Sequence, residues 1–344
     1  MAIVSWVDLH GDELSGMRVL VTGAAGFIGS HLCDALVALG CHVIGLDDLT
    51  AGHQDNLLLA RRIGGDRFRF VTGSILDSST LTDCMSGCQV VFHVAALPSV
   101  PRSIKNPMAF HEVNVTGTQL VLEAAREAHV HRLIFSASSS SYGDSPTLPK
   151  VESMQPLPKS PYAANKLAGE HLVRAYADSY DIDAIALRYF NIFGPRQNIS
   201  SPYSGVIAVF ANQLLSNHPV TVNGIAYSRD FTFVDNAVHA NLLAAKTTKP
   251  LGGQVVNVAC GQGVTVMDLA LAMAELVERP HLKPIQGPGR AGDVMHSVAQ
   301  IDLARKVLGY TPIIDFQEGL KATVEWYQSA WQSSENAAVT QLHQ

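Results

Sequence analysis

The sequence predicts an α/β protein with a doubly wound parallel sheet and a smaller, interleaved C-terminal unit. Short apolar runs alternate with stretches of helical apolar spacing through the first 190 residues, a pattern typical of a parallel sheet with helices on both faces. A glycine-rich turn, residues 23–29, joins the first apolar run to the first helical stretch. After residue 191, Pro, Ser, Asn and Gly become frequent and the strands become shorter, which predicts a second unit.

Each element follows from its own local pattern. Apolar runs predict strands at residues 18–22, 42–46, 68–71, 90–94, 131–135, 184–188 and 255–258. Helical spacing predicts helices at residues 30–39, 107–129, 161–178, 267–279, 302–308 and 316–329. We therefore expect a first domain of residues 17–190 that regains about 230–260, and a second domain of residues 191–229 and 261–332. The pattern assigns no role to residues 1–16 or to the chain after Gln332.

Composition excludes several classes of protein. The 344 residues are 47% hydrophobic and 16% charged, which excludes a disordered chain. A net charge of −6 without a basic stripe argues against a nucleic-acid partner, and no run is apolar enough to predict a membrane span. Five cysteines without a Cys-x-x-Cys pair, and acidic residues where a secretion leader would be apolar, predict a cytoplasmic protein. We expect no metal site.

The turn Gly23-Ala-Ala-Gly26-Phe-Ile-Gly29 predicts a dinucleotide site. Glycines let the backbone approach a pyrophosphate, and the following helix presents free N–H groups to it. Asp47 ends the second strand, 18 residues after Gly29. A carboxylate there accepts hydrogen bonds from a ribose 2′-hydroxyl and repels a 2′-phosphate, so we expect NAD, with Asp48 able to share this role. The alternative is a turn that only packs a helix on a strand, with Asp47 as a cap.

Tyr162 and Lys166 are the candidate chemical pair. Residues four apart share one face of a helix, and a lysine ammonium lowers the pKa of a neighbouring phenol. Such a phenol can take a proton from a sugar hydroxyl while hydride leaves the same carbon. The serine-rich run 136–141 follows a predicted strand, which places it at the edge of the sheet where ligands bind. The alternatives are a surface pair on a helix and a flexible serine linker.

Together these features resemble the extended short-chain dehydrogenase/reductase superfamily, whose sheet is the Rossmann fold. Three further segments resemble UDP-sugar 4-epimerases and occur in the order found there: Leu-Arg-Tyr-Phe-Asn at 187–191, Ser-Arg-Asp-Phe at 228–231 and Arg-Ala-Gly-Asp at 290–293. The resemblance covers about residues 17–330. One departure is Gly73-Ser74-Ile75, where the family often has Gly-Asp-Ile, so adenine contacts at Ser74 should differ.

The resemblance implies a set of site residues. The catalytic ones would be Ser138, Tyr162 and Lys166. Those around NAD would be Gly23, Gly26, Phe27, Ile28, Gly29, Asp47, Asp48, Ser74, Ile75, Ala95, Ala96, Asn114, Ser136, Tyr162, Lys166, Tyr189 and Phe190. Those around the UDP-sugar would be Ser99, Ser138, Ser139, Tyr162, Asn191, Gly205, Val206, Val222, Asn223, Arg229, Arg290, Asp293 and Ser297. Arginine suits the diphosphate, because its planar fork matches phosphate oxygens.

The implied reaction is reversible epimerisation at C4 of a UDP-hexose through a 4-keto sugar, with enzyme-held NAD taking and returning the hydride. In the family a small residue at the position of Ser297 goes with tolerance of a 2-acetamido group, and the loop 97–103 resembles that of epimerases preferring N-acetylated sugars. We therefore favour UDP-GlcNAc/UDP-GalNAc over UDP-Glc/UDP-Gal. The alternative for Ser297 is a side chain that merely faces solvent.

Three other activities share this fold. UDP-glucuronate 4-epimerase stays open, because serines and threonines could hold a sugar carboxylate. A dehydratase or decarboxylase needs an acid beside the serine, and Ser139, Ser140 and Ser141 supply none. A non-catalytic NAD-binding scaffold usually lacks the Tyr or Lys.

The resemblance also implies a homodimer through helices at about 107–129 and 161–178. Their apolar positions, Leu120, Val121, Ala124, Leu167 and Val173, suit a helix bundle between two subunits but equally suit packing on the sheet.

Overall fold

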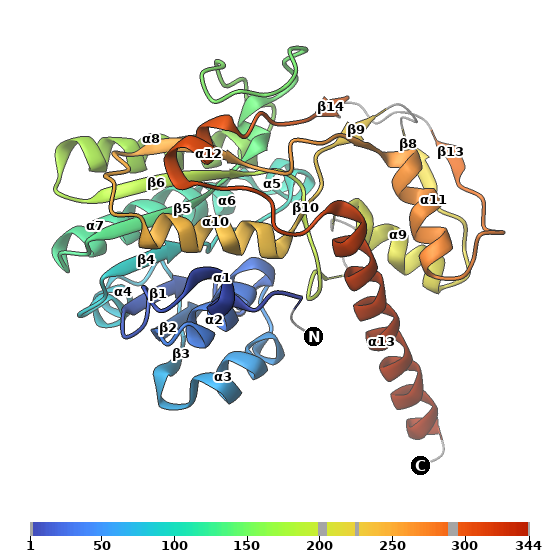
Figure 1. Ribbon diagram of the computed structural model, residues 1–344, viewed down its shortest axis with the longest axis horizontal. Coiled ribbons are helices and arrows are strands. Elements are labelled where there is room, and N and C mark those ends of the chain that lie inside the picture. Colours follow the sequence, from blue (N-terminus) through green and yellow to red (C-terminus); the bar gives the residue numbers. More distant parts are fainter. Residues whose placement is uncertain (1–2, 199–204, 224–226, 288–294, 343–344) are drawn as a thin grey trace.

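The computed structural model describes residues 3–198, 205–223, 227–287 and 295–342, with side chains as far as residue 332. Its centre is a seven-stranded sheet in which every neighbouring pair is parallel, as Figure 1 shows. The order is β11 (Gln254–Val258), β6 (Asp183–Tyr189), β5 (Arg132–Ser138), β4 (Val90–His93), β1 (Arg18–Thr22), β2 (His42–Asp47) and β3 (Phe68–Thr72). The predicted fold class is confirmed, and each predicted strand lies within two or three residues of its predicted bounds.

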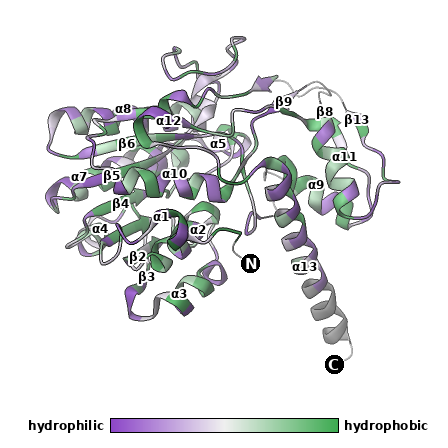
Figure 2. Ribbon diagram, in the orientation of Figure 1, coloured by the Kyte–Doolittle hydropathy of each residue, from purple (hydrophilic) through white to green (hydrophobic). Residues whose placement is uncertain are grey.

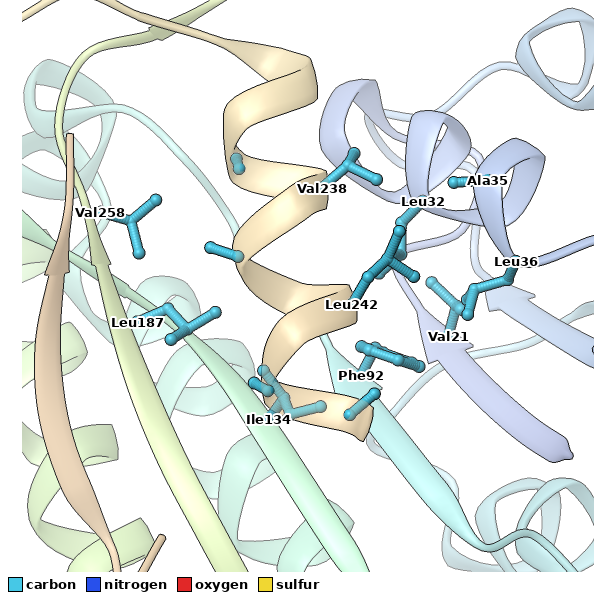
Figure 3. Close-up of a cluster of buried hydrophobic side chains, with 14 of the residues drawn as sticks. Val21, Leu32, Ala35, Leu36, Phe92, Ile134, Leu187, Val238, Leu242 and Val258 are labelled. Atoms are coloured by element: carbon cyan, nitrogen blue, oxygen red, sulfur yellow. The ribbon is translucent and has the colours of Figure 1, made fainter. Parts of the chain in front are cut away.

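Helices cover both faces of this sheet. On one face α2 (Phe27–Ala38) and α10 (Val234–Lys246) share a buried apolar cluster with the strands. Figure 3 shows Val238 and Leu242 of α10 beside Leu32 of α2. On the other face α4 (Ser78–Met85), α7 (Gly117–Glu127) and α8 (Pro161–Ser179) pack over a second cluster. The outer helices alternate hydrophobic and hydrophilic residues (Figure 2), as expected when one side meets the sheet and the other meets water.

The predicted helix 107–129 is present over residues 107–127, with one irregular turn inside it. After α5 (Val100–Lys105) the chain forms α6 (Pro107–His111), a π-helical turn η3 (Glu112–Thr116) and α7 in direct succession. The π-turn contains the buried Asn114, and such turns within helices occur frequently at functional sites.

The apolar positions proposed for a bundle between subunits are largely used within the subunit. Val121, Ala124 and Val173 belong to the buried cluster against the sheet, and Leu120 packs against the same cluster. These four residues therefore stabilise the monomer fold.

A second group of elements lies beside the sheet (Figure 1), and a third apolar cluster forms its core. Its helices are α9 (Val206–Leu215), α11 (Val266–Leu276) and α13 (Phe316–Leu342). Three small sheets accompany them: β7 (Ile192–Phe193) with β10 (Thr232–Phe233), β8 (Thr221–Asn223) with β13 (Ile285–Gly287), and β9 (Ser228–Arg229) between β12 (Val264–Thr265) and β14 (His296–Ser297). The intervening segment α10–β11 returns to the main sheet, where β11 pairs with β6. No helix in the part of the chain described here is long and apolar enough to cross a membrane.

The N-terminal segment, which the sequence left unassigned, packs beside α10. Trp6 and His10 of α1 (Trp6–His10) are buried, and His10 Nε2 lies 3.0 Å from Nδ1 of His239 on α10. Burial lowers the pKa of each imidazole to about 4, so neither carries a charge at neutral pH. The remaining short elements are η1 (Gln54–Leu57), α3 (Leu58–Gly64), η2 (Gly65–Arg67), η4 (Ser139–Tyr142) and α12 (Asp302–Leu308).

Candidate active site

A cavity of about 600 Å³ opens at the carboxyl ends of the sheet strands, which is where ligands bind in sheets of this topology. Segments that follow five different strands and the start of α8 line it. Sixteen of the residues that the sequence predicted meet here: Gly23, Gly26, Phe27, Ile28, Gly29, Asp47, Asp48, Ile75, Ala95, Ala96, Ser99, Ser136, Tyr162, Lys166, Tyr189 and Gly205.

Two glycines of the turn, Gly23 and Gly29, leave no room for a side chain. Gly23 has φ +71°, and a Cβ there would lie 2.8 Å from the Ala95 backbone. A Cβ on Gly29 would lie 2.0 Å from the Gly23 carbonyl oxygen. The N-cap residue of α2 is Gly26, which has no side chain to cap the first N–H groups of the helix. The turn therefore presents backbone donors and the positive end of the helix dipole to a diphosphate.

Asp47 both stabilises the turn and lines the cavity. Its Oδ2 accepts from the Ala25 amide at 3.0 Å, and its Oδ1 accepts from the Leu49 amide at 2.8 Å. Burial raises the pKa of this carboxyl group. A carboxylate has about four lone-pair positions, so stabilising the turn does not prevent Asp47 from accepting a ribose hydroxyl. These features fit an adenosine diphosphate moiety such as that of NAD.

The segment after Asp47 also lines the cavity, although no sequence motif assigned it a role. Residues 49–53 and Asn56 are all lining residues. Asn56 Nδ2 donates to the Ala25 carbonyl at 2.9 Å, and a Cβ on Gly52 would lie 2.9 Å from Asp47 Oδ1. The signal in the sequence was Gly52, a glycine shortly after the acidic residue, which permits this close approach.

Helix α8 places Tyr162 and Lys166 on one face at the cavity. It begins at Pro161, and the side chain of Ser160 accepts from the Ala163 amide at 3.2 Å as its N-cap. Lys166 Nζ donates to the Ser136 carbonyl at 2.8 Å. Burial lowers the pKa of this lysine to about 8, and the negative charge of Glu170 opposes that effect.

The predicted depression of the Tyr162 pKa is wrong for this structure. Burial raises the pKa of the phenol, and only a hydrogen bond with Ser138 works in the other direction. The physical reason is that the Lys166 ammonium is directed to the Ser136 carbonyl, while desolvation disfavours the phenolate.

His93, a residue that the sequence analysis did not single out, lies beneath this pair. Its Nδ1 is 2.8 Å from Thr22 Oγ1 and its Nε2 is 3.0 Å from Thr118 Oγ1. Burial, assisted by the charge of Lys166, lowers the pKa of the ring to about 3. The imidazole therefore stays neutral and leaves Lys166 without a cationic neighbour at this position.

The serine turn lies at the carboxyl end of β5. Ser138 is the last residue of that strand, and Ser139 begins η4. Ser138 Oγ lies 2.8 Å from Ser140 Oγ and accepts from the Ser140 amide at 3.2 Å. Ser138 and Ser139 do not line the cavity itself, whereas the preceding Ser136 and Ala137 do.

Two residues expected around the cofactor, Ser74 and Asn114, lie outside the cavity lining. Asn114 is fully buried and clamps the backbone of Leu97, accepting from its amide at 2.7 Å and donating to its carbonyl at 3.0 Å. Ser74 Oγ accepts from the Leu76 amide at 3.2 Å within its own loop. Neither is among the residues that line the cavity, and Asn114 holds the lining segment 95–99 in place through Leu97.

Of the three predicted site residues at the end of β6, only one lines the cavity. Tyr189 lines the cavity, but Phe190 is fully buried in the core. Asn191, with φ +39°, donates from Nδ2 to the Asp230 carbonyl at 3.1 Å. Phe190 thus anchors the end of β6 in the core, and Asn191 connects it to Asp230, the residue directly after β9.

The predicted UDP-sugar residues of the second unit lie outside the cavity lining, namely Val206, Val222, Asn223, Arg229 and Ser297. Arg229 Nη1 donates to the Ser228 and Met295 carbonyls at 2.9 and 3.0 Å. Ser297 is half-buried and pairs in register with Arg229 across β9 and β14. Arg290 and Asp293 lie outside the described residues.

Asp230 ties this half together. Its buried carboxylate accepts from the backbone amides of Cys260, Gly261 and Ala299 at 2.9, 3.0 and 3.1 Å. Burial raises its pKa to about 6 in spite of these bonds. Asp230 therefore joins its own segment, next to Arg229, to residues 260–261 and to residue 299, which are distant in the sequence.

Comparison with known proteins identifies the family. A model described as the NAD dependent epimerase/dehydratase family matches residues 19–259. The UDP-glucose 4-epimerase of Mycolicibacterium smegmatis is 40% identical over 317 residues, which are 91% of this chain and 99% of that protein.

Two solved structures have the same fold. The UDP-N-acetylglucosamine 4-epimerase from Methanobrevibacter ruminantium, in complex with UDP-N-acetylmuramic acid, superposes with a TM-score of 0.86 at 34% identity, covering 92% of this chain and 99% of that one. The Thermus thermophilus UDP-glucose 4-epimerase in complex with NAD gives 0.80 at 34% identity, covering 91% and 100%. Together with the glycine turn, Asp47 and the Tyr162–Lys166 pair, these matches show that the chain is an NAD-using enzyme that belongs to the NAD-dependent epimerase/dehydratase family.

Proposed function

We propose that this enzyme catalyses the reversible C4 epimerisation of a UDP-hexose, with UDP-GlcNAc and UDP-GalNAc as its preferred pair. The observation that carries the proposal is the meeting of the glycine turn, Asp47, Tyr162 and Lys166 in one cavity. A site for a nucleotide cofactor and a proton-transfer pair line the same cavity. This arrangement allows a substrate carbon to be oxidised and then reduced without leaving the site.

Tyr162 acts as the base for the C4 hydroxyl, and the Lys166 ammonium lies one helical turn away, where it donates to the Ser136 carbonyl. NAD held by the glycine turn and Asp47 would supply the acceptor and donor for the C4 hydride. The pKa of Lys166 is about 8, so the ammonium form predominates below that pH and is lost above it. Ser138 hydrogen-bonds Tyr162 and can orient both the phenol and the substrate oxygen. His93 is neutral and therefore adds no positive charge next to Lys166.

The preference for N-acetylated sugars rests on Ser297. This half-buried serine is the register partner of Arg229, the arginine that we assign to the substrate diphosphate. A serine there leaves volume that a tyrosine ring would occupy, and a 2-acetamido group needs such volume. The same small side chain accepts plain hexoses, so UDP-Glc and UDP-Gal would be secondary substrates.

Proton NMR of the purified enzyme with UDP-GlcNAc and no added NAD tests the proposal. New anomeric signals of UDP-GalNAc would support C4 epimerisation, a retained cofactor and tolerance of the acetamido group together. If the spectrum stays unchanged, also after NAD is added, the N-acetylated pair is excluded. UDP-Glc and then UDP-glucuronate follow in the same assay, and turnover of the uronate alone would replace the proposed substrate.

A further inference from the structure

The loop 194–198 belongs to the cavity and to the second unit at once. It follows β7, and its residues Arg196, Gln197 and Asn198 line the cavity. The hydroxyl of Tyr327 on α13 donates to the Gln197 carbonyl at 3.2 Å. Tyr327 is fully buried in the third apolar cluster, so one side of the loop is fixed to the core of the second unit.

The other side of the loop is fixed to the cofactor-binding helix α2. Arg196 Nη2 lies 2.6 Å from Asp34 Oδ2, and the two side chains are only 17% and 11% exposed. One turn earlier on α2, His31 lies with its Nε2 3.1 Å from the Pro195 carbonyl. Burial lowers the pKa of this imidazole to about 3, so the ring is neutral and donates from Nε2 to the carbonyl.

The backbone at Arg196 indicates that its side chain matters. Its φ is +68°, a left-handed conformation that glycine adopts freely and that disfavours a residue with a Cβ. A residue with a Cβ keeps this conformation only where the surrounding structure compensates its cost. The short contact with Asp34 is the compensating interaction that the structure displays.

We propose that Arg196 is a positioning residue whose ion pair with Asp34 holds the 194–198 loop on the cofactor-binding helix, so that the nucleotide-sugar part of the cavity is assembled against the NAD part. The inference rests on the proposed function only in taking a UDP-sugar as the ligand of this loop. Asp34 does not line the cavity, and any effect of Asp34 on ligand binding must therefore pass through the loop.

The test uses the NAD-loaded enzyme and UDP alone, because UDP is common to all the candidate substrates. Titration calorimetry of Asp34→Asn should show UDP binding weakened by about tenfold, and Arg196→Met should show a similar loss. The double variant should be little worse than either single one, because both remove the same interaction. Arg196→Lys should recover part of the affinity. In turnover assays KM should rise more than kcat falls.

Asp183→Asn is the matched control. Asp183 forms an equally short ion pair with Arg132, at 2.6 Å with side chains 16% and 4% exposed, at the opposite end of the sheet strands. Its loss should lower the melting temperature as Asp34→Asn does, while UDP affinity stays within twofold of the wild type.

Three results would overturn the inference. Unchanged UDP affinity in Asp34→Asn, with a loss only in Arg196→Met, would make Arg196 a direct ligand contact and not a positioning residue. An equal loss in Asp183→Asn would reduce the effect to general destabilisation. Failure of the wild-type enzyme to bind UDP would remove the proposed function as well, which separates the two failures.

Discussion

Replacing Glu170 by Gln should destabilise the protein strongly. Glu170 lies one turn after Lys166 on α8, and its two carboxylate oxygens accept from Arg188 Nε at 2.9 Å and Nη2 at 2.6 Å. The side chains are 2% and 4% exposed. Breaking such a buried pair from one side costs about 3–5 kcal/mol, because a buried charge loses its partner. With an unfolding entropy of about 2.1 cal/mol/K per residue, 344 residues convert this loss to a drop in melting temperature of roughly 4–7 °C.

The same substitution should change the pH dependence of catalysis. The negative charge of Glu170 raises the pKa of Lys166, which burial lowers to about 8. Without that charge the pKa falls further, so the ammonium is lost at lower pH. The alkaline limb of the kcat profile should therefore move toward acid, while kcat at pH 6 changes less.

Thermal melts and pH–rate profiles measure both effects, and Asp178→Asn provides the control on the same helix. Asp178 pairs with Arg174 at 2.9 Å, but both side chains are 58% exposed. An exposed pair of this kind contributes about 0.3–0.5 kcal/mol, which corresponds to less than about 1 °C here. A Glu170→Gln melting temperature within 1 °C of the wild type, or an unmoved alkaline limb, would refute the reasoning.

Three further substitutions test the site. Gly29→Ala should prevent NAD binding, because its Cβ would lie 2.0 Å from the Gly23 carbonyl oxygen; the NAD content after incubation with excess cofactor and gel filtration measures this, and wild-type content would contradict it. Lys166→Met should lower kcat by roughly 10²–10⁴-fold with NAD still bound, and a smaller loss would remove the lysine from the proton-transfer pair. Ser297→Tyr should lower kcat/KM for UDP-GlcNAc by roughly tenfold or more while sparing UDP-Glc, as competition between the two sugars in one NMR tube would reveal.

The fold was predictable because its signals are local. Each parallel strand, buried on both faces, reads as a short apolar run, and the glycine turn marks the first strand–helix junction. The helical spacing of residues 107–129 predicted the helix that the chain forms, but not the π-helical turn at residues 112–116, where Asn114 contacts the distant Leu97. No local pattern announces a contact of that kind.

The site was predictable where a motif dictates chemistry and unpredictable where tertiary contacts do. Asp47, Tyr162 and Lys166 are recognisable from residue type and spacing. Arg196 and His93 are not, since Arg196 pairs with Asp34, 162 residues away, and His93 contacts Thr22, 71 residues away. The pKa of Tyr162 was mispredicted for a related reason, since the sequence places Lys166 near the phenol but does not show the Ser136 carbonyl that takes the ammonium.

The pairing of β11 with β6 has a consequence for how the chain is made. Val258 is the register partner of Tyr189, and 69 residues separate them in the sequence. At a translation rate of about 5–20 residues per second, β11 is synthesised roughly 3–14 s after β6. During that interval β6 has no strand on this side. Until then the apolar strand Ala184–Leu187 presents unpaired N–H and C=O groups, a template on which nascent chains associate. Fragments that end before residue 254 should therefore aggregate even though they contain the entire glycine turn and the Tyr162–Lys166 pair.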